Sequence, residues 1–576
     1  MSVAAAVPGS AGPLNGSWPW LKSYPAGVAW DQSFPARPVY AFLDEAAERF
    51  GANTCTNFLG RTHSYREIHT LVNHAAKGLQ GLGVGKSSKV GLFLPNTPTF
   101  LVAYYAVLKA GGTVVNFNPL YSLEELEHQA RDSGATLMVT LNLKVLFNKV
   151  EALLAKGVIE RAVVASFPSL LPPVKQAMFR IAKSQELANV AASPVASKVV
   201  SQKDLMTNDG RYTPPVIDPE RDLAVLQYTG GTTGVPKGAM LTHANLSANV
   251  EQVASWAGAL DYGKERVMAI LPFFHVFGMT VVMNFGVSRA SEIILVPKFE
   301  LNETLKLINQ VKPTLMPGVP TLFNAILNHR KIKSYDLSSL KFCLSGGAAL
   351  PVEVKRGFEA LTGCKLVEGY GLSETSPVAS ANPPDGPVKE GSIGMPLPAT
   401  RISIRSLEDP AKELGLGEDG EICISGPQVM PGYWQKPEET KTVFVDGFFR
   451  TGDIGHMDEE GFVFIVDRLK DMINCSGFKV YPRRVEEVLY EHPAVEEVIV
   501  IGIPNVHRGE APKAFVKLRE GQTATPQALM EFVRPRLSKI EMPEEIEMRA
   551  SLPKTMIGKL SKKELKAEEA AKRKAR

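Results

Sequence analysis

The chain has 576 residues, 44% of them hydrophobic and 22% charged, a composition typical of a globular enzyme of about three to five domain-sized units. Its formal net charge of +4 is small for this length and does not support nucleic-acid binding. The five cysteines are scattered, without metal-ligand spacing, which predicts structural thiols in a reduced, cytoplasmic chain.

No segment of the sequence predicts export or a membrane span. The first 16 residues are small, polar and uncharged, so we expect no signal peptide. No apolar run approaches the roughly 18 residues of a spanning helix. We therefore expect a cytoplasmic protein, and we leave open a peripheral contact with the inner face of the cell membrane.

An extended arm and then an alternation of strands and helices are predicted for the first half of the chain. Residues 1–36, rich in Pro, Gly and Trp, form the arm. Capping boxes at Ser64–Glu67 and Ser122–Glu125 mark two helix starts, and apolar strands are expected at 90–94, 113–117 and 136–141. The alternation resumes after about residue 215 and runs to about 400, which predicts mostly parallel sheets covered by helices.

The region between these two α/β stretches, residues 150–215, is predicted to be irregular. It contains one amphipathic helix at 174–183, with Val174, Ala177, Met178 and Ile181 on a single face and three basic residues off that face. Such a helix can lie on an anionic membrane surface. We favour the commoner alternative, in which its apolar face covers a core.

From about residue 400 the pattern changes twice. Alternating segments at 401–404, 421–424 and 462–465 predict a small antiparallel sheet. After Lys470 a compact α+β pattern follows. We therefore expect an arm (1–36), a large domain (37–470, with a β subdomain at about 400–470) and a small C-terminal domain (471–576).

One loop, residues 228–238, has the composition of a phosphate-binding site. It follows an apolar strand and holds four glycines, three threonines and Lys237, so it offers backbone N–H groups, hydroxyls and one ammonium to a polyphosphate. It is not a Walker A loop, because its lysine lies between Pro236 and Gly238. The alternative is a flexible surface turn.

Six further motifs follow the phosphate loop in order. They are Pro272–His275, Ser345–Ala349, Gly369–Glu374, Arg450–Asp453, Asp467–Pro482 and Pro553–Lys559. Together the seven motifs resemble the acyl-adenylate-forming superfamily, over about residues 40–565, and within it the bacterial fatty acyl-CoA synthetases. The resemblance implies a large α/β domain of parallel sheets with a β subdomain, and a small, mobile α+β C-terminal domain.

The resemblance also implies the reaction and its participants. A fatty acid is activated by ATP to acyl-AMP and then to acyl-CoA, with Mg²⁺ as cofactor, CoA as co-substrate, and pyrophosphate and AMP as products. The residues implied to bind ATP are Thr229, Gly230, Gly231, Thr232, Thr233, Gly234, Lys237, Gly346, Gly347, Ala348, Gly369, Tyr370, Gly371, Ser373, Asp453 and Arg468.

Four residues are expected to carry the chemistry. A carboxylate facing a polyphosphate requires Mg²⁺ between them, which assigns the metal to Glu374. Lys559 would neutralise charge as the adenylate forms, His275 would position the acyl carboxylate, and Lys470 would be the domain hinge. Taken alone, these could be a surface glutamate, a lysine on a solvated helix face and a core histidine, and Arg450 with Asp453 could be a surface ion pair.

Several functions remain open at this point. The acyl pocket is expected to include Phe273–Met279, which does not fix the chain length of the acid. A transfer to a carrier protein, an aryl or hydroxycinnamate CoA ligase, a luciferase-like oxygenase and a non-catalytic nucleotide-binding protein are the alternatives. The sequence also leaves a homodimer open, and it does not identify CoA-binding residues beyond the Gly477–Lys479 loop.

Overall fold

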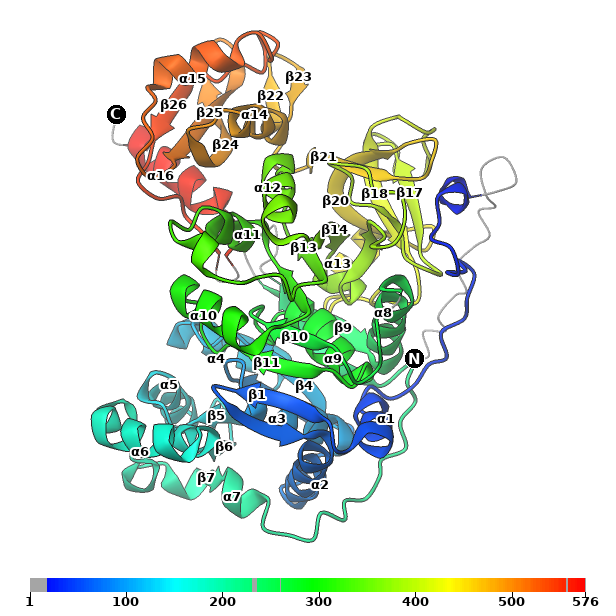
Figure 1. Ribbon diagram of the computed structural model, residues 1–576. Helices are drawn as coiled ribbons and strands as arrows, with labels where there is room; N and C mark the ends of the chain where they lie inside the picture. The colour runs from blue at the N-terminus through cyan, green and yellow to red at the C-terminus, as the bar shows by residue number, and fades with distance from the viewer. Residues whose placement is uncertain (1–17, 230–235, 259, 556–557, 575–576) are drawn as a thin grey trace.

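The computed structural model describes residues 18–229, 236–258, 260–555 and 558–574. Figure 1 shows two large sheets with their helices in the lower and central parts of the molecule, and a small β subdomain and a C-terminal domain above them. This arrangement confirms the predicted fold class.

A nine-stranded sheet within the described residues carries several predicted site residues at its strand ends. Its inner strands, from β14 to β1, all run parallel, and antiparallel strands close both edges. The order is β16 (Met395–Pro396), β15 (Val378–Ala381), β14 (Lys365–Gly371), β13 (Phe342–Gly346), β12 (Leu315–Gly318), β10 (Arg266–Ala269), β11 (Glu292–Leu295), β1 (Thr54–Phe58) and β2 (Arg61–Ser64).

A seven-stranded sheet carries the phosphate loop. The strands are parallel except for the last pair, which brackets the loop. The order is β7 (Val199–Ser201), β6 (Arg161–Ala165), β5 (Leu137–Leu141), β3 (Lys89–Phe93), β4 (Thr113–Phe117), β8 (Leu223–Thr229) and β9 (Lys237–Thr242).

Helices cover both sheets, as the βα alternation predicts. Both predicted capping boxes are present, at the starts of α2 and α4, and α3, which is apolar on all sides, is buried along its whole length. The helices are α1 (Ala41–Phe50), α2 (Tyr65–Gly81), α3 (Pro98–Lys109), α4 (Leu123–Ser133), α5 (Lys144–Ala155), α6 (Pro173–Ala182), α7 (Gln202–Leu205), α8 (His243–Trp256), the π-helix η7 (Gly278–Asn284), α9 (Phe285–Ser288), α10 (Leu301–Val311), α11 (Pro320–Leu327) and α12 (Val352–Thr362).

The prediction that residues 150–215 are irregular is wrong. The strands β6 and β7 extend the seven-stranded sheet, and α5, α6 and α7 lie in or beside this region. The prediction that α6 covers a core is also wrong, because none of its residues is buried. Its sequence pattern is amphipathic, but the apolar face points to solvent, with Val174, Met178 and Ile181 exposed.

The β subdomain and the C-terminal domain complete the molecule. The subdomain pairs β17 (Arg401–Arg405), β18 (Gly420–Ser425), β19 (Phe444–Val445), β20 (Phe448–Met457) and β21 (Val463–Arg468) antiparallel, with α13 (Pro437–Thr442) beside them. The C-terminal domain contains β22 (Ile473–Cys475), β23 (Phe478–Val480), β24 (Val495–Asn505), β25 (Gly509–Leu518), β26 (Glu545–Met548), α14 (Pro482–Tyr490), α15 (Pro526–Val533) and α16 (Lys562–Lys574).

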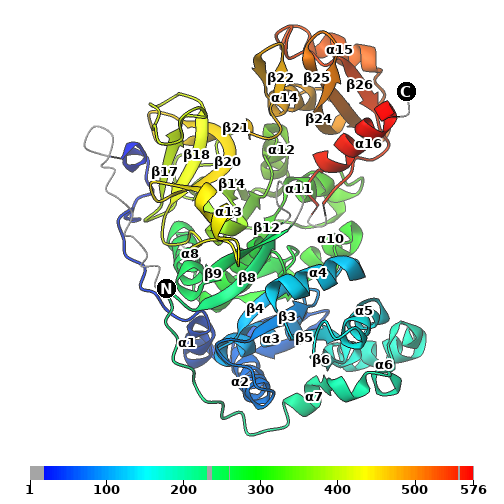
Figure 2. The same cartoon turned by 180° about the vertical axis from the view of Figure 1, so that it is seen from behind.

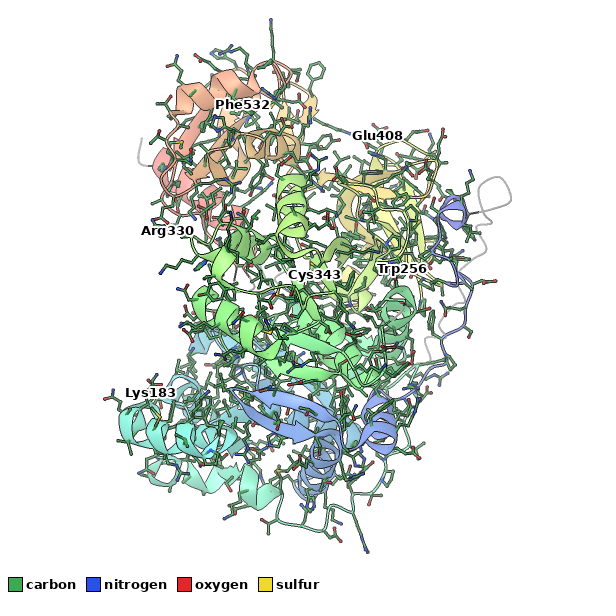
Figure 3. All side chains as sticks on the ribbon, viewed as in Figure 1. Lys183, Trp256, Arg330, Cys343, Glu408 and Phe532 are labelled. Atoms are coloured by element: carbon green, nitrogen blue, oxygen red, sulfur yellow. The ribbon has the colours of Figure 1, made fainter. Side chains whose placement is uncertain are left out.

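The apolar cores of these parts are separate. The core of the two large sheets and the β subdomain ends at Val463, and that of the C-terminal domain begins at Ile473. The predicted division at residue 470 falls between them and stays a prediction. Side chains on and just after α11 join the two parts: Thr321 donates to the carbonyl of Gly558 at 2.6 Å, and Arg330, labelled in Figure 3, pairs with Glu520.

The described part of the N-terminal arm packs against the β subdomain and the last strands of the nine-stranded sheet. The Trp18 and Trp20 rings stack with centroids 5.0 Å apart, Trp30 donates to the carbonyl of Thr400 at 2.8 Å, and Tyr24 donates to that of Pro396 at 2.8 Å. The aromatic residues of the arm thus anchor it. Among the described residues, no helix combines the length and apolarity that a membrane crossing requires.

Candidate active site

A cavity of about 560 Å³ lies where the two large sheets, the β subdomain and the C-terminal domain meet. Most of the predicted site residues that the structure describes line it, although they come from all parts of the chain. Those lining the cavity are Thr229, Lys237, His275, Gly346, Gly347, Gly369, Tyr370, Gly371, Ser373, Glu374, Asp453, Arg468, Lys470 and Lys559.

Strand ends bring these residues together. The parallel strands β13 and β14 end at Gly346 and Gly371, and the carboxyl edge of a parallel sheet is where such folds bind ligands. From the other large sheet, β8 ends at Thr229 and β9 begins at Lys237. The residues between these two strands include Gly230, Gly231, Thr232, Thr233 and Gly234, which lie outside the described residues.

A buried carboxylate, Asp453, forms one wall of the cavity. It lies on β20 directly opposite Arg468 on β21, and Arg468 Nε is 3.2 Å from Asp453 Oδ1. Tyr370 donates its hydroxyl to Asp453 Oδ2 at 2.6 Å. The Asp453 charge raises the pKa of Arg468, and the contacts with Arg468 and Tyr370 fix the orientation of the Asp453 carboxylate before any ligand binds.

A second buried carboxylate, Glu374, lies beside the end of the phosphate loop. Tyr433 donates its hydroxyl to Glu374 Oε1 at 2.7 Å, and the Tyr433 ring lies under Lys237, whose Nζ is 5.3 Å from the ring centroid. Burial raises the pKa of Glu374, and the Tyr433 hydrogen bond opposes that shift. Glu374 is therefore not a surface glutamate: it faces the cavity beside a lysine ammonium.

The interpretation of Arg450 and Asp453 as a surface ion pair is wrong. Arg450 Nη2 pairs instead with Glu421 Oε2 at 2.7 Å, and Glu421 also accepts the N–H of Gly452 at 3.0 Å. This arrangement holds the turn before Asp453 and leaves the Asp453 carboxylate for Arg468 and the cavity.

Lys559 is the C-terminal domain's contribution to the cavity lining. Its side chain passes so closely over Gly347 that a Cβ atom at that position would lie 2.4 Å from Lys559 Cε. Gly347 also has a positive φ of +83°, a backbone conformation that favours glycine. Next to Lys559 in the chain, the Gly558 N–H donates to the Thr555 carbonyl at 2.9 Å.

Burial is the main influence on the protonation of Lys559 and of His275. Burial, with a smaller effect of Arg468, lowers the pKa of Lys559 to about 8. Burial lowers the pKa of His275 to about 3, and the Lys559 charge adds to this shift. His275 is therefore a neutral imidazole at physiological pH. Lys559 stays largely protonated there, with a pKa that an approaching anion would raise.

Not every predicted residue reaches the cavity. Ala348 is exposed and is not among the residues that line it, although its neighbours Gly346 and Gly347 are. Of the predicted acyl stretch, only His275, Val276 and Phe277 line the cavity, whereas Phe273 and Met279 are fully buried. The residues Met556 and Ile557 of the last motif lie outside the described residues.

The sequence interpretation missed two residues of the site, Tyr433 and Glu421. Tyr433 follows Pro431–Gly432 in a loop without regular periodicity, and only the structure brings its hydroxyl to Glu374. Glu421 lies in a strand, β18, whose alternation predicts secondary structure and not its pairing with Arg450. The sequence around each of them does not indicate a role in the site, because each contacts a residue that is distant in the chain.

The residues of the cavity fit a magnesium ion that is bound together with a phosphate substrate. They do not fit a metal ion whose ligands all come from the protein. Within the described residues, no group of three or more His, Cys, Asp or Glu side chains could hold a metal ion. Mg²⁺ at phosphate sites takes one or two carboxylates and completes its shell with phosphate oxygens and water. The buried carboxylate of Glu374, beside Lys237, meets that requirement.

Two family models match the chain. Residues 43–434 match the AMP-binding enzyme model, and residues 484–559 match the AMP-binding enzyme C-terminal domain model. The first match includes both strands that bracket the phosphate loop and the strand end with Glu374, and the second ends at Lys559. Together they contain 19 of the 29 residues that line the cavity; the other ten, which include Asp453, Arg468 and Lys470, lie between the two matched segments.

Individual relatives resemble the chain over almost its whole length. A long-chain-fatty-acid–CoA ligase of Bacillus subtilis is 46% identical over 558 residues, which cover 96% of this chain and 98% of the relative. A ligase of the same name from Escherichia coli O157:H7 is 38% identical, with 95% and 98% covered. The crystal structure of ATP-bound MatB from Rhodopseudomonas palustris superimposes with a TM-score of 0.80 at 28% identity, over 92% of this chain and 98% of that one.

Proposed function

Because this chain belongs to the AMP-binding enzyme family, we propose that it is a long-chain fatty acid–CoA ligase. The acid's carboxylate attacks the α-phosphorus of ATP to give acyl-AMP and pyrophosphate, and the thiol of CoA then displaces AMP. One structural observation carries this proposal: Lys559 of the C-terminal domain enters the cavity that holds Asp453, Glu374 and the ends of the phosphate loop. Its full-length likeness to two fatty acid–CoA ligases supports the substrate class.

In the first step, two anions must approach each other, and the cavity supplies positive groups in advance. The ribose hydroxyls would donate to Asp453, which Arg468 and Tyr370 hold in place. Lys237 and the phosphate loop would bind the β- and γ-phosphates, and Lys559 would contact the carboxylate and the α-phosphate. Asp453 is already held by Tyr370 and Arg468, so the ribose would bind it without reorganisation, and the positive groups would stabilise the developing charge.

Glu374 would hold Mg²⁺ against the phosphates, and the metal would neutralise charge on the departing pyrophosphate. The Tyr433 hydroxyl fixes one carboxylate oxygen of Glu374, so the orientation of the carboxylate is set by the protein. His275, neutral at physiological pH, would position the acyl carboxylate at the apolar end of the cavity beside Phe277.

The second step would use a different pose of the C-terminal domain. Lys470 lines the cavity between β21 and β22 and would act as the hinge. The Gly477–Lys479 loop is not among the residues that line the cavity, and Phe478 is exposed. A rotation about Lys470 would withdraw Lys559 and bring this loop to the thiol's path.

An acid panel from C4 to C18, with pyrophosphate release and CoA thioester both measured, tests this function. We expect both products with long-chain acids. Pyrophosphate without thioester would favour transfer to a carrier protein, and activity confined to aryl acids would favour a hydroxycinnamate-type ligase. If no acid released pyrophosphate, the proposed function would be wrong.

Replacing Asp453 with alanine is expected to weaken ATP binding about tenfold to a hundredfold, because a charged hydrogen-bond acceptor for the ribose is lost. Isothermal titration calorimetry with ATP measures the change. In Asp453→Asn the side chain still accepts from Tyr370 and the loss should be smaller. An unchanged affinity in Asp453→Ala would rule out the ribose role.

The location and the partners are also proposals. The five free, buried cysteines among the described residues support a reducing, cytoplasmic location. A homodimer and a peripheral membrane contact are proposed as well.

A further inference from the structure

Helix α6 presents an unpartnered apolar ridge at the outer edge of the molecule. Val174, Met178 and Ile181 are 72%, 63% and 83% exposed, and Ala177 between them is exposed too. In both views α6 lies at the periphery of the seven-stranded-sheet half, away from the C-terminal domain (Figures 1 and 2). Three large apolar side chains so exposed on a single ten-residue helix are unusual in a soluble surface and mark an interaction site.

The opposite side of α6 explains why this ridge faces outward. Phe179 and Gln176 are half-buried, and the Phe179 ring packs on that of Phe167 with centroids 5.1 Å apart. At 100° per residue, Val174, Met178 and Ile181 lie on the side of the helix away from Phe179. The single aromatic anchor therefore fixes the rotation of α6 and directs the apolar ridge to solvent.

Basic side chains flank the ridge on both sides. Lys175 and Arg180 lie between the apolar ridge and the anchored side of the helix, and Lys175 Nζ donates to the carbonyl of Leu59 at 2.8 Å. Lys183 follows directly, and Figure 3 shows it at the outer edge of the molecule. Its only ion-pair partner in the described residues is Glu186, at 3.1 Å.

The segment around this helix is basic. Residues 161–203 contain six Lys or Arg and one acidic residue, Glu186, for a formal net charge of +5. The stretch 559–576 also has a net charge of +5, but it belongs to the C-terminal domain. The apolar ridge is therefore exposed on a basic segment of a nearly neutral protein.

This combination fits one kind of partner. A convex ridge of apolar side chains with cations on its flanks matches the boundary between lipid acyl chains and anionic headgroups, where apolar residues insert and Lys and Arg reach the phosphates. We propose that α6 docks this protein on an anionic lipid bilayer, with Val174, Met178 and Ile181 inserted and Lys175, Arg180 and Lys183 at the headgroups.

The apolar ridge and the charge of α6 support the docking surface. The advantage of docking for catalysis rests on the proposed function. A long-chain fatty acid partitions strongly into bilayers, so an enzyme held on the bilayer would meet its substrate at high local concentration. Vesicle binding is measured without substrate, so failure of the docking proposal and failure of the proposed function can be told apart.

Flotation with vesicles tests the proposal on the full-length protein. We expect the protein to float with vesicles of 30% phosphatidylglycerol in phosphatidylcholine, and to do so less with pure phosphatidylcholine or in 0.5 M salt, which screens the charges. The triple variant V174S/M178S/I181S should lower the partition coefficient about tenfold or more. The charge variant R180Q/K183Q should lower binding to the anionic vesicles only.

A matched control replaces apolar residues that are as exposed but lie elsewhere: Val216 and Val506 are 86% and 97% exposed, and V216S/V506S should float like the wild type. With a water-soluble C8 acid, the triple variant should keep wild-type turnover, which shows that it folds. A fluorophore on Met178→Cys should shift to the blue on anionic vesicles, and one on Val216→Cys should not.

Three results would overturn the proposal. The wild type could fail to float with the anionic vesicles, or the triple variant could float as well as the wild type. Size-exclusion chromatography could instead show a wild-type dimer that the triple variant dissociates, in which case the ridge is an interface between copies of this chain.

Discussion

Replacing Lys559 with alanine is expected to lower the rate of acyl-AMP formation about a hundredfold to a thousandfold, the range for a group that stabilises transition-state charge. The side chain enters the cavity over Gly347 and lies beside Asp453 and Arg468. Its ammonium is the charge that the C-terminal domain contributes to the cavity lining. Pyrophosphate release with a fixed acid measures this step.

The second half-reaction separates this role from a general loss of structure. When acyl-AMP is supplied, Lys559→Ala should form the CoA thioester at nearly the wild-type rate, because the proposed pose for that step withdraws Lys559. Lys563→Ala, an exposed neighbour, should behave like the wild type in both assays. Equal losses in both half-reactions would show that Lys559 has no specific role in adenylation.

The pKa of Lys559 predicts the pH dependence of adenylation. Because burial lowers that pKa to about 8, the ammonium is kept below pH 8 and lost above it. The kcat/KM of adenylation, which reports the free enzyme, should therefore fall as the pH rises through about 8. Bound anions raise the pKa, so kcat should fall at a higher pH. The variant Lys559→Arg stays charged over this pH range. Its kcat/KM and kcat should therefore not decline with rising pH, even if its turnover is slower than that of the wild type.

Replacing Glu374 with glutamine is expected to lower kcat about a hundredfold and to raise the Mg²⁺ concentration needed for activity. The amide oxygen can still accept from Tyr433, so the local structure should persist. Mn²⁺ binding in the presence of ATP, followed by electron paramagnetic resonance, provides a readout separate from turnover and should weaken in parallel.

Tyr433→Phe is the matched comparison for the Glu374 prediction. It keeps the carboxylate and the ring under Lys237 but removes the hydroxyl that orients Glu374, and such outer partners usually change metal affinity or activity about tenfold to a hundredfold. If Glu374→Gln left both the Mg²⁺ requirement and Mn²⁺ binding unchanged, the metal assignment would be wrong.

Local sequence signals predicted much of the fold. The capping boxes at Ser64 and Ser122 were both found, because a cap is satisfied within four residues and does not depend on the rest of the chain. The parallel strands were readable because strands buried on both faces are apolar throughout. The prediction that residues 150–215 are irregular failed in part because β7 has only three residues, all half-buried, which is too short for any periodicity.

The orientation of α6 shows the limit of pattern reasoning. Its amphipathic pattern was read correctly, but amphipathicity does not say which side faces the protein. Phe179, off the apolar face, decides this by packing on Phe167. In the site, the ordered motifs identified Asp453, Glu374 and Lys559, whereas Tyr433 and Glu421 were missed because their partners are 59 and 29 residues away.

The passage of Lys559 over Gly347 has a thermodynamic consequence. Within the described residues, only this side chain of the C-terminal domain lines the cavity, so a ligand that contacts the Lys559 ammonium favours the present domain arrangement. A ligand whose contacts end at Asp453 and Arg468 in both arrangements leaves their populations unchanged, however tightly it binds. A carboxylate beside the α-phosphate would shift the populations toward the present arrangement, and a thiol bound by the Gly477–Lys479 loop would shift them toward the other.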